Sequence, residues 1–574
     1  MDRLKARAEA WAAADPDPDT AAEMRRLVSA GDVPELEDRL TGRLEFGTAG
    51  LRGILGAGPN RMNRAVARQA TAGLARYLLK TDPDAASRGV VVGRDARRLS
   101  DEMAHDAAGV LAAHGIPALV APEAAPTPHA AFGLKQLAAA AAVVVTASHN
   151  PPEYNGYKVY WGDGAQIVPP HDRGIAAEIE AAGPASGIPL LPEDEARSRG
   201  LWRDLPGSVG EGWLAGILGQ QRHPSAGRDA VIVTTALHGV GGKWLGDALY
   251  RAGFGSVHPV PEQQTPDGRF PTVSFPNPEE KGALDLALAL AERTRADLLL
   301  ANDPDADRLA VGARDSSGRM RVFSGNETGV LLGHYALTQL SERPAKPLLL
   351  ATIVSSSQLG RIARDLGARY EETLTGFKWL MNRALEVEAE EGASLVFAYE
   401  EALGYTVGDV VRDKDGVGAG VLFADLGGWC RSRGVTAWDY LAEIQRAHGL
   451  TVSSQKSVVR PGREGQQEIA GLMERLRKDP PVQVAGEKVV SLRDYDLGIV
   501  REGERERPTG LPRSNVLAFV LEGGARITVR PSGTEPKLKY YFERSEVPAT
   551  GEALAATRER AEKRLREMEG AFGT

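Results

Sequence analysis

The sequence predicts α/β domains followed by a C-terminal α+β domain. Five short apolar runs stop abruptly at polar residues, and helical segments lie between them. Strands that alternate with helices are typical of α/β domains with mostly parallel sheets. Toward the C-terminus, strand patterns instead follow one another through tight turns. At roughly 150 residues per domain, the 574 residues correspond to about four domains.

The five apolar runs have the pattern of buried strands that end in candidate site residues. Helical periodicity lies between them, as in residues 282–297 and 357–370. Ligands of such sheets gather outside the carboxyl ends of the strands, so polar residues at those ends are functional candidates. The runs are "AVVVTASHN" (142–150), "DAVIVTTALHG" (229–239), "DLLLANDPDADR" (297–308), "PLLLATIVSSS" (347–357) and "SLVFAYEEALGY" (394–405).

The C-terminal part has the pattern of an antiparallel sheet with a packing helix. Residues 515–544 contain alternating strands, joined first by Gly523 and Gly524 and then by "PSGTEP". A charged helix is predicted over 551–572, and its apolar side is expected to pack on the sheet. That side consists of Leu554, Ala561, Leu565 and Met568.

Stretches rich in proline and glycine divide the chain into four parts. They lie at 206–212, 314–325 and 448–455. We therefore expect domains at 1–206, 207–318, 319–449 and 450–574.

Composition and charge exclude several classes of protein. The net charge of -8 and the pI near 5.8 give no electrostatic footprint for nucleic acid or for an anionic membrane. A single cysteine, Cys430, excludes an intrachain disulfide and any multi-cysteine metal site. The N-terminus lacks a signal-peptide core, and the longest apolar stretch, 137–145, is about half a membrane span. A cytoplasmic location is expected, and both a monomer and a homodimer are compatible with the sequence.

Three alternating aspartates form the strongest candidate for a metal site. Asp303, Asp305 and Asp307 follow a predicted strand, and close carboxylates repel one another unless a cation lies between them. Mg²⁺ is the expected ion. An EF-hand is excluded, because Arg308 and Arg314 occupy the positions that require Gly and Glu. A solvated acidic turn is the alternative.

The stretch "VRPSGTEPKLK" is a candidate phosphate site. A guanidinium, two hydroxyls, an ammonium and exposed backbone N–H groups between two strands can surround a phosphate. A polar hairpin turn would have the same pattern. The residues concerned are Arg530, Ser532, Gly533, Thr534 and Lys537.

Three further charged stretches have both a functional and a plain surface interpretation. "LEFGTAGLRGILGAG" carries Arg52 but lacks the spacing of a dinucleotide fingerprint or a Walker loop. Glu400 and Glu401 lie at a predicted strand end and could bind sugar hydroxyls, and Lys414 in "DKDG" could neutralise phosphate or relay a proton. Simple loop and surface chemistry remains the alternative for each.

Ser148 also lies at a predicted strand end. A hydrolase with His149 as base is excluded locally, since the serine lacks the GxSxG elbow and adjacent side chains usually point apart. A hydroxyl that carries a covalent phosphoryl group remains, with Lys158 close in sequence and the three aspartates to hold a metal.

Taken together, these stretches resemble the α-D-phosphohexomutase superfamily. The similarity runs in the same order over most of the chain, through "GTAGLRG", "TASHNPPEYNGYKVY", "DPDADR", "TLTGFKW", "YEEALGY" and "RPSGTEPK". The resemblance implies three related α/β domains with mixed, mostly parallel sheets and a C-terminal α+β domain, arranged around a central active-site cleft. The four domains would carry the phosphoserine, metal-binding, sugar-binding and phosphate-binding loops in that order.

The resemblance also implies residue roles. Ser148 is the expected phosphoserine, and Mg²⁺ would be held by a phosphoserine oxygen and the three aspartates. Arg308 would support the same phosphate, Lys158 would be the general acid/base, and Arg52 and Lys414 complete the expected catalytic set. Expected sugar contacts are Thr375, Gly376 and Glu400, and the phosphate that is not reacting would bind Arg530, Ser532, Gly533 and Thr534, beside Lys537.

One stretch departs from the pattern of the family. The usual sugar loop reads Gly-Glu-x-Ser-Gly, whereas Tyr399 and Ala402 replace its glycine and serine here. A hydroxyl contact to the sugar is therefore expected to be lost. The forms "EEALGY" and "TGFKW" resemble a branch that includes phosphoglucomutases, phosphopentomutases and a glucose 1,6-bisphosphate synthase.

The implied reaction is intramolecular phosphoryl transfer through a bisphosphorylated sugar. The expected substrates are small sugar phosphates, foremost α-D-glucose 1-phosphate and glucose 6-phosphate, with glucose 1,6-bisphosphate or a related sugar as activator. Phosphopentomutase, phosphomannomutase and glucose 1,6-bisphosphate synthase are alternatives. From another class, a catalytically silent sugar-phosphate binding protein is opposed by the intact Ser148 and aspartates, because a binding module needs neither.

Overall fold

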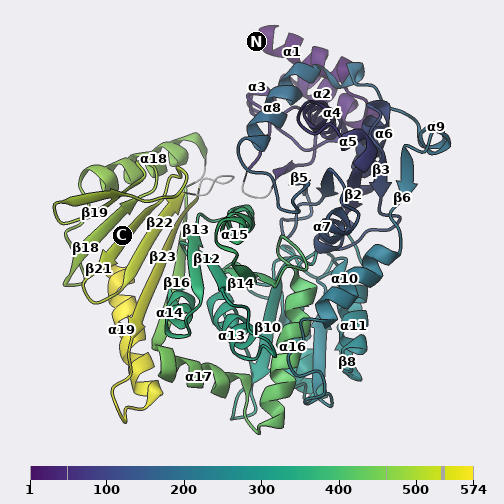
Figure 1. The fold of residues 1–574 in the computed structure, drawn as a ribbon. Helices are drawn as coiled ribbons and strands as arrows, with labels where there is room; N and C mark the ends of the chain where they lie inside the picture. The colour runs from purple at the N-terminus through teal and green to yellow at the C-terminus, as the bar shows by residue number, and fades with distance from the viewer. Residues whose placement is uncertain (1, 48–49, 461, 532–536, 573–574) are drawn as a thin grey trace.

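The chain folds into four sheets, each with its own helices. The computed structural model describes residues 2–47, 50–460, 462–531 and 537–572 (Figure 1). The first sheet lies at the upper right of this view, the second and third fill the lower part, and the fourth stands at the left. This arrangement confirms the predicted fold class, while the predicted domain boundaries stay a prediction.

The first sheet is mixed, with order β1-β5-β4-β2-β3-β6. Strand β5 is antiparallel to both neighbours, and the remaining pairs are parallel. Its strands are β1 (Leu51–Ile54), β2 (Val90–Arg94), β3 (Ala118–Val120), β4 (Ala141–Val145), β5 (Tyr154–Trp161) and β6 (Trp202–Asp204). Its helices are α4 (Arg64–Thr81), α5 (Ala85–Arg88), α6 (Ser100–Ala113), α7 (Thr127–Gln136), α8 (His171–Ala182), η1 (Ala185–Gly187) and α9 (Glu193–Ser198).

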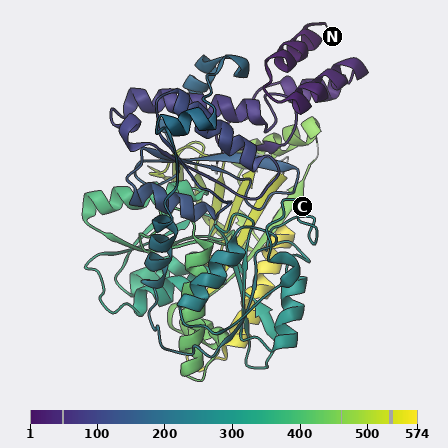
Figure 2. The same cartoon turned by 90° about the vertical axis from the view of Figure 1, so that its right-hand side faces the viewer.

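Three helices precede the first sheet and lie at the top of the molecule (Figure 2). They are α1 (Asp2–Ala14), α2 (Pro18–Ala30) and α3 (Val33–Leu40). They hold the turn after β1, because Glu23 accepts from the Ala57 backbone N at 2.9 Å and Arg39 donates to the Ala57 carbonyl at 3.2 Å.

The second sheet has the order β11-β10-β9-β7-β8. The pairs β9–β7 and β7–β8 are parallel, and β10 is antiparallel to β9 and β11. Its strands are β7 (Val231–Thr235), β8 (Ser256–Pro259), β9 (Leu298–Asn302), β10 (Leu309–Arg314) and β11 (Met320–Val322). Its helices are α10 (Ser208–Leu218), α11 (Gly241–Arg251), η2 (Pro261–Gln263) and α12 (Asp285–Thr294).

The third sheet has the order β13-β12-β14-β15, with only β15 antiparallel to its neighbour. Its strands are β12 (Pro347–Thr352), β13 (Arg369–Thr373), β14 (Ser394–Glu400) and β15 (Gly404–Val407). The helices of this part are α13 (Gly325–Thr338), α14 (Gln358–Asp365), α15 (Phe377–Glu391), α16 (Gly416–Ser432) and α17 (Ala437–His448).

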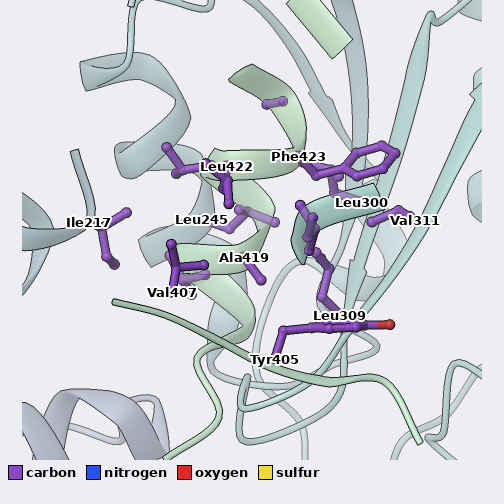
Figure 3. Packing of buried hydrophobic residues seen from close by; sticks show 14 of the residues in the cluster. Ile217, Leu245, Leu300, Leu309, Val311, Tyr405, Val407, Ala419, Leu422 and Phe423 are labelled. Carbon is purple, nitrogen blue, oxygen red and sulfur yellow. The ribbon is translucent and has the colours of Figure 1, made fainter. Parts of the chain in front are cut away.

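Helix α16 joins the cores of the second and third sheets. Its residue Phe423 lies beside Leu300 of β9 and Val311 of β10, and Leu422 and Val407 of β15 belong to the same cluster (Figure 3). All of these side chains are buried. Burial of such apolar side chains contributes about 1.5–3 kcal/mol each, so this shared core holds the two sheets together.

The fourth sheet is antiparallel, with order β16-β23-β22-β21-β18-β19-β20, and β17 pairs with β18. Helix α19 packs Ala561, Leu565 and Met568 into its core, as predicted. The elements are β16 (Leu450–Val459), α18 (Gly462–Lys478), β17 (Gln483–Val484), β18 (Glu487–Asp494), β19 (Ile499–Glu502), β20 (Arg505–Pro508), β21 (Leu517–Leu521), β22 (Arg526–Pro531), β23 (Lys537–Glu546) and α19 (Leu554–Ala571).

The five predicted strands are confirmed as β4, β7, β9, β12 and β14. One predicted helix was too long: the pattern over 357–370 ends at Asp365, and strand β13 begins at Arg369. Gly367 has a φ of 65°, a left-handed conformation that ends a helix. In the part of the chain that the structure describes, no helix combines the length and hydropathy that a membrane span needs.

Candidate active site

Ser148 lies in the turn after β4 and is held in an unusual conformation. Its φ of 52° is in the left-handed region, and only 2% of the residue is exposed. The Ser148 backbone N donates to Thr146 Oγ1 at 2.8 Å. Its hydroxyl donates to Asp303 Oδ2 at 2.7 Å and lies 3.2 Å from His149 Nδ1. The first and second sheets thus meet at this hydroxyl.

The three aspartates form one buried carboxylate cluster in the turn between β9 and β10. Oxygen atoms of Asp303, Asp305 and Asp307 lie within 4.8 Å of one another, and each residue is at most 1% exposed. Asp303 Oδ1 accepts from the Arg308 backbone N at 3.0 Å, and Asp305 Oδ2 accepts from the Thr127 hydroxyl at 2.7 Å. The turn therefore aims all three carboxylates at one point.

Two lysines neutralise part of this charge. Lys158 Nζ on β5 lies 2.8 Å from Asp305 Oδ2 and 2.7 Å from Asp307 Oδ2. Lys414 Nζ lies 3.2 Å from Asp307 Oδ2 and 3.4 Å from Asp413 Oδ1. Burial acts to lower the pKa of Lys158, but the two carboxylates outweigh it and raise that pKa, so Lys158 is protonated here.

The pKa values of the carboxyl groups in the cluster shift in opposite directions. Burial, reinforced by the neighbouring carboxylates, raises the pKa of Asp303 well above its usual range. Burial acts in the same direction on Asp307, but Lys158 and Lys414 outweigh it and lower the Asp307 pKa. Oδ1 atoms of Asp305 and Asp307 are buried and accept no hydrogen bond from the described residues. Unsatisfied hard oxygen atoms in a converging set are the donors that Mg²⁺ prefers, so these residues fit that ion.

Two arginines lie beside Ser148. Arg52 donates to Asn150 Oδ1 at 2.8 Å, and Arg308 lies 3.9 Å from Glu279. Burial, together with the charge of Arg308, lowers the pKa of Arg52 to about 10. Two guanidinium groups that repel each other favour an anion between them.

The predicted sugar loop is only partly at the surface of the site. Glu400 Oε1 accepts from the Gly376 backbone N at 3.0 Å, which brings the strand end of β14 to the start of α15. Gly376 has φ 109°, which favours glycine. Thr375, in contrast, is 5% exposed. Tyr399 is fully buried and its hydroxyl donates to the Ser356 carbonyl at 3.2 Å, so it belongs to the core.

One cavity of about 510 Å³ gathers residues from all four sheets. Phosphate-binding candidates Arg530 and Lys537 line it on the side of the fourth sheet, and Ala402 lines it on the side of the third. Ser532, Gly533 and Thr534 lie outside the described residues. Thr375, Asp303 and Asp305 do not line it, although the two aspartates lie directly behind Ser148 and Lys158. The predicted residues in its wall are Arg52, Ser148, Lys158, Asp307, Arg308, Gly376, Glu400, Lys414, Arg530 and Lys537.

Family models match most of the chain in four consecutive pieces. They are described as phosphoglucomutase/phosphomannomutase alpha/beta/alpha domains I (43–185), II (213–317) and III (324–445), and the C-terminal domain (468–560). The chain belongs to the phosphoglucomutase/phosphomannomutase family. It is therefore a member of the α-D-phosphohexomutase superfamily and a phosphomutase, a type of isomerase.

Relatives of this phosphomutase have several names. A phosphopentomutase of Mus musculus is 36% identical over 596 residues, which cover 99% of this chain and 94% of the relative. A probable phosphomannomutase of Haemophilus influenzae is 40% identical over 486 residues, which cover 84% of this chain and 93% of the relative. A phosphoglucomutase structure from Paramecium, the phosphoprotein pp63/parafusin in an open form, shares the fold with a TM-score of 0.67 and 17% identity, covering 93% of this chain and 96% of that chain.

The cavity of the phosphomutase also contains residues that sequence reasoning missed. The segment from Phe275 to Glu280 follows no strand, so no strand-end pattern marks it. Lys539 could have been found, because it follows Lys537 by two residues on a predicted strand and period-two alternation places both on one face. The missed residues in the wall are His149, Asn150, Phe275, Asn277, Glu279, Glu280, Phe377, Gln455, Ser457, Lys539 and Tyr541, whereas Glu401 was already a candidate beside Glu400.

Proposed function

We propose that the phosphomutase carries a phosphoryl group on Ser148 and uses it to interconvert a sugar 1-phosphate with the isomer that is phosphorylated at its terminal hydroxyl. The observation that supports this best is the hydrogen bond from the Ser148 hydroxyl to Asp303, together with a cavity whose wall contains Ser148, Arg530 and Lys537. A nucleophile near one cluster of charge, and a second basic region in the wall of the same cavity, suit a substrate with a phosphate at each end.

Asp303, Asp305 and Asp307 would hold Mg²⁺ at the Ser148 end. When bound there, the ion would neutralise charge on the phosphoryl oxygens. Arg52 and Arg308 bind the same oxygens from the cavity side. The Ser148 Oγ–P bond breaks while a sugar hydroxyl oxygen bonds to phosphorus, and the proton of that hydroxyl passes to Lys158 Nζ, which has given its own proton to Ser148 Oγ.

Lys158 Nζ is the proton donor in this state, because the carboxylates around it keep it protonated. It gives a proton to Ser148 Oγ as the phosphoryl group leaves, and it takes one back in the reverse direction. Lys414 balances the charge of Asp307 while this proton moves.

The bisphosphorylated sugar then turns end for end and returns its other phosphate to Ser148. Glu400 accepts hydrogen bonds from sugar hydroxyls in either orientation, and Arg530 and Lys537, with Ser532, Gly533 and Thr534, hold the phosphate that is not reacting. Gly376 and Thr375 shape the sugar loop. Glucose 1,6-bisphosphate or a related sugar primes Ser148, and the enzyme works in the cytoplasm.

α-D-Glucose 1-phosphate is the first proposed substrate, since the phosphoserine, metal and phosphate motifs are present and the sugar loop resembles a branch that includes phosphoglucomutases. Pentose 1-phosphates are the second, because a relative that covers almost the whole chain is named phosphopentomutase. Mannose 1-phosphate and bisphosphate synthesis stay alternatives.

The test combines intact mass with a substrate panel. Protein incubated with glucose 1,6-bisphosphate should gain one phosphoryl group, and S148A should gain none and show no turnover. Rates with glucose, mannose, ribose and deoxyribose 1-phosphates, with Mg²⁺ and with EDTA, then rank the substrates. Absence of turnover on all four with activator present would favour the silent binding protein, and normal turnover by S148A would refute the carrier assignment.

A further inference from the structure

The buried guanidinium of Arg97 binds the backbone of the turn that carries Ser148. Arg97 lies between β2 and α6, and its side chain is 0% exposed. Its NH1 donates to the Pro151 carbonyl at 2.8 Å and to the Tyr154 carbonyl at 3.2 Å. Its NH2 donates to the Ser148 carbonyl at 2.6 Å and to the Asn150 carbonyl. One cation thus binds four carbonyl oxygens of a single loop.

The same network fixes the backbone of Ser148 from its other side. Asp95 pairs with Arg97 Nε at 3.3 Å and accepts from the Thr146 hydroxyl at 2.7 Å. Thr146 Oγ1 in turn accepts from the Ser148 backbone N. A serine in the left-handed region is unfavourable and persists only where the surroundings hold it. Arg97 and its partner Asp95 hold Ser148 in this conformation.

The influence of Arg97 extends to a second residue of the site. Asn150, whose carbonyl Arg97 binds, also accepts from Arg52 through its side chain. The face of the Arg97 guanidinium is covered by the Phe270 ring, with its centroid 4.8 Å away. Gly268 packs against the same residue so closely that an added Cβ would lie 2.8 Å from Arg97 Cα. Arg97 is not in the cavity wall that the described residues form.

We propose that Arg97 is a positioning residue for phosphoryl transfer, which fixes Ser148 Oγ and the Arg52 guanidinium against the carboxylate cluster without touching substrate. This inference rests on the proposed function. The planar fork of arginine supplies donors in several fixed directions, whereas a lysine ammonium on a flexible stem cannot reach four carbonyls of one loop. A positive charge alone, as a lysine would supply it, should therefore not replace the Arg97 guanidinium.

The test compares R97K and R97M with a matched control, R88M. Arg88 also binds backbone carbonyls of the same domain, those of Ala138 and Ala139, and pairs with Asp82, but it does not contact the Ser148 turn. Each variant is measured for kcat, KM, urea unfolding midpoint and Ser148 phosphorylation by intact mass. Both Arg97 variants should lose about 10²-fold in kcat, as misplaced reacting groups do, with KM nearly unchanged. R88M should lose stability while its kcat stays near that of the parent.

The outcomes separate positioning from simple stabilisation. R97K with the kcat of the parent protein would overturn the inference. The inference would also be overturned if the loss of kcat in the Arg97 and Arg88 variants were proportional to their loss of stability. If R97M does not fold, R97K decides, because it keeps the buried charge. A parent protein without turnover on any sugar phosphate would refute the proposed function and this inference with it, whereas turnover that R97K leaves intact would refute the inference alone.

Discussion

Replacing Lys158 by methionine tests the charge balance at the carboxylate cluster. The side chain of methionine fills a similar space but leaves Asp305 and Asp307 without the ammonium that lies 2.7–2.8 Å from each. Breaking a buried ion pair by removing one partner costs about 3–5 kcal/mol. Asp305 keeps the Thr127 hydroxyl and Asp307 keeps Lys414, so we expect the lower end, about 3 kcal/mol.

The assay is urea unfolding of K158M and the parent protein in EDTA and in Mg²⁺. In EDTA, K158M should unfold at a clearly lower urea concentration. In Mg²⁺ the difference should shrink, because the cation neutralises the carboxylates that lost their lysine.

A second buried lysine provides the control. Lys378 is 8% exposed, and its Nζ donates to the Gly47 carbonyl at 2.9 Å; the described residues offer it no carboxylate partner. K378M should therefore lose only about 1 kcal/mol, independent of Mg²⁺. Equal losses in K158M and K378M, or a K158M as stable as the parent in EDTA, would refute the reasoning.

Three further predictions concern the third sheet. Burial and the charge of Glu400 raise the pKa of Glu401 from 4.5 to about 7. Between these values the folded protein binds one more proton than the unfolded chain, so the free energy of unfolding falls as pH rises from 4.5 to about 7. E401Q should reduce this pH dependence in urea unfolding, and an unchanged slope would contradict the assignment. G329A should lower the free energy of unfolding by about 1–3 kcal/mol, because an added Cβ would lie 2.3 Å from the Tyr399 ring. An unchanged melting temperature would exclude this clash. A402S places a hydroxyl in the cavity wall and should raise kcat/KM about five-fold for the sugar that this hydroxyl contacts. If kcat/KM changes for no sugar of the panel, the contact is not made.

The strand-end residues were predictable because their signal is local. Ser148, Asp303 and Glu400 each follow a run of apolar residues in the sequence, and the structure places each at the end of the corresponding strand. Their convergence follows from the rule that ligands gather at the carboxyl ends of strands.

The remaining contacts depend on packing between distant segments. The four carbonyls that Arg97 binds lie more than 50 residues away in sequence, and the partner of Lys378 lies 331 residues away. Tyr399 replaces the glycine of the family's sugar loop, but its ring fills the space beside Gly329 in the core. None of these three contacts has a pattern in the sequence around the residue itself.

The cavity with walls from four sheets has a consequence for biosynthesis. A ribosome completes Ser148 and the carboxylate cluster before it makes β22 and β23, which carry Arg530 and Lys537. A nascent chain at that stage has Ser148 and its charged neighbours, but it lacks the part of the cavity wall that Arg530 and Lys537 form. If Ser148 carries a phosphoryl group as proposed, water would reach that group in such a chain, and β22 and β23 would complete the wall that protects it from hydrolysis.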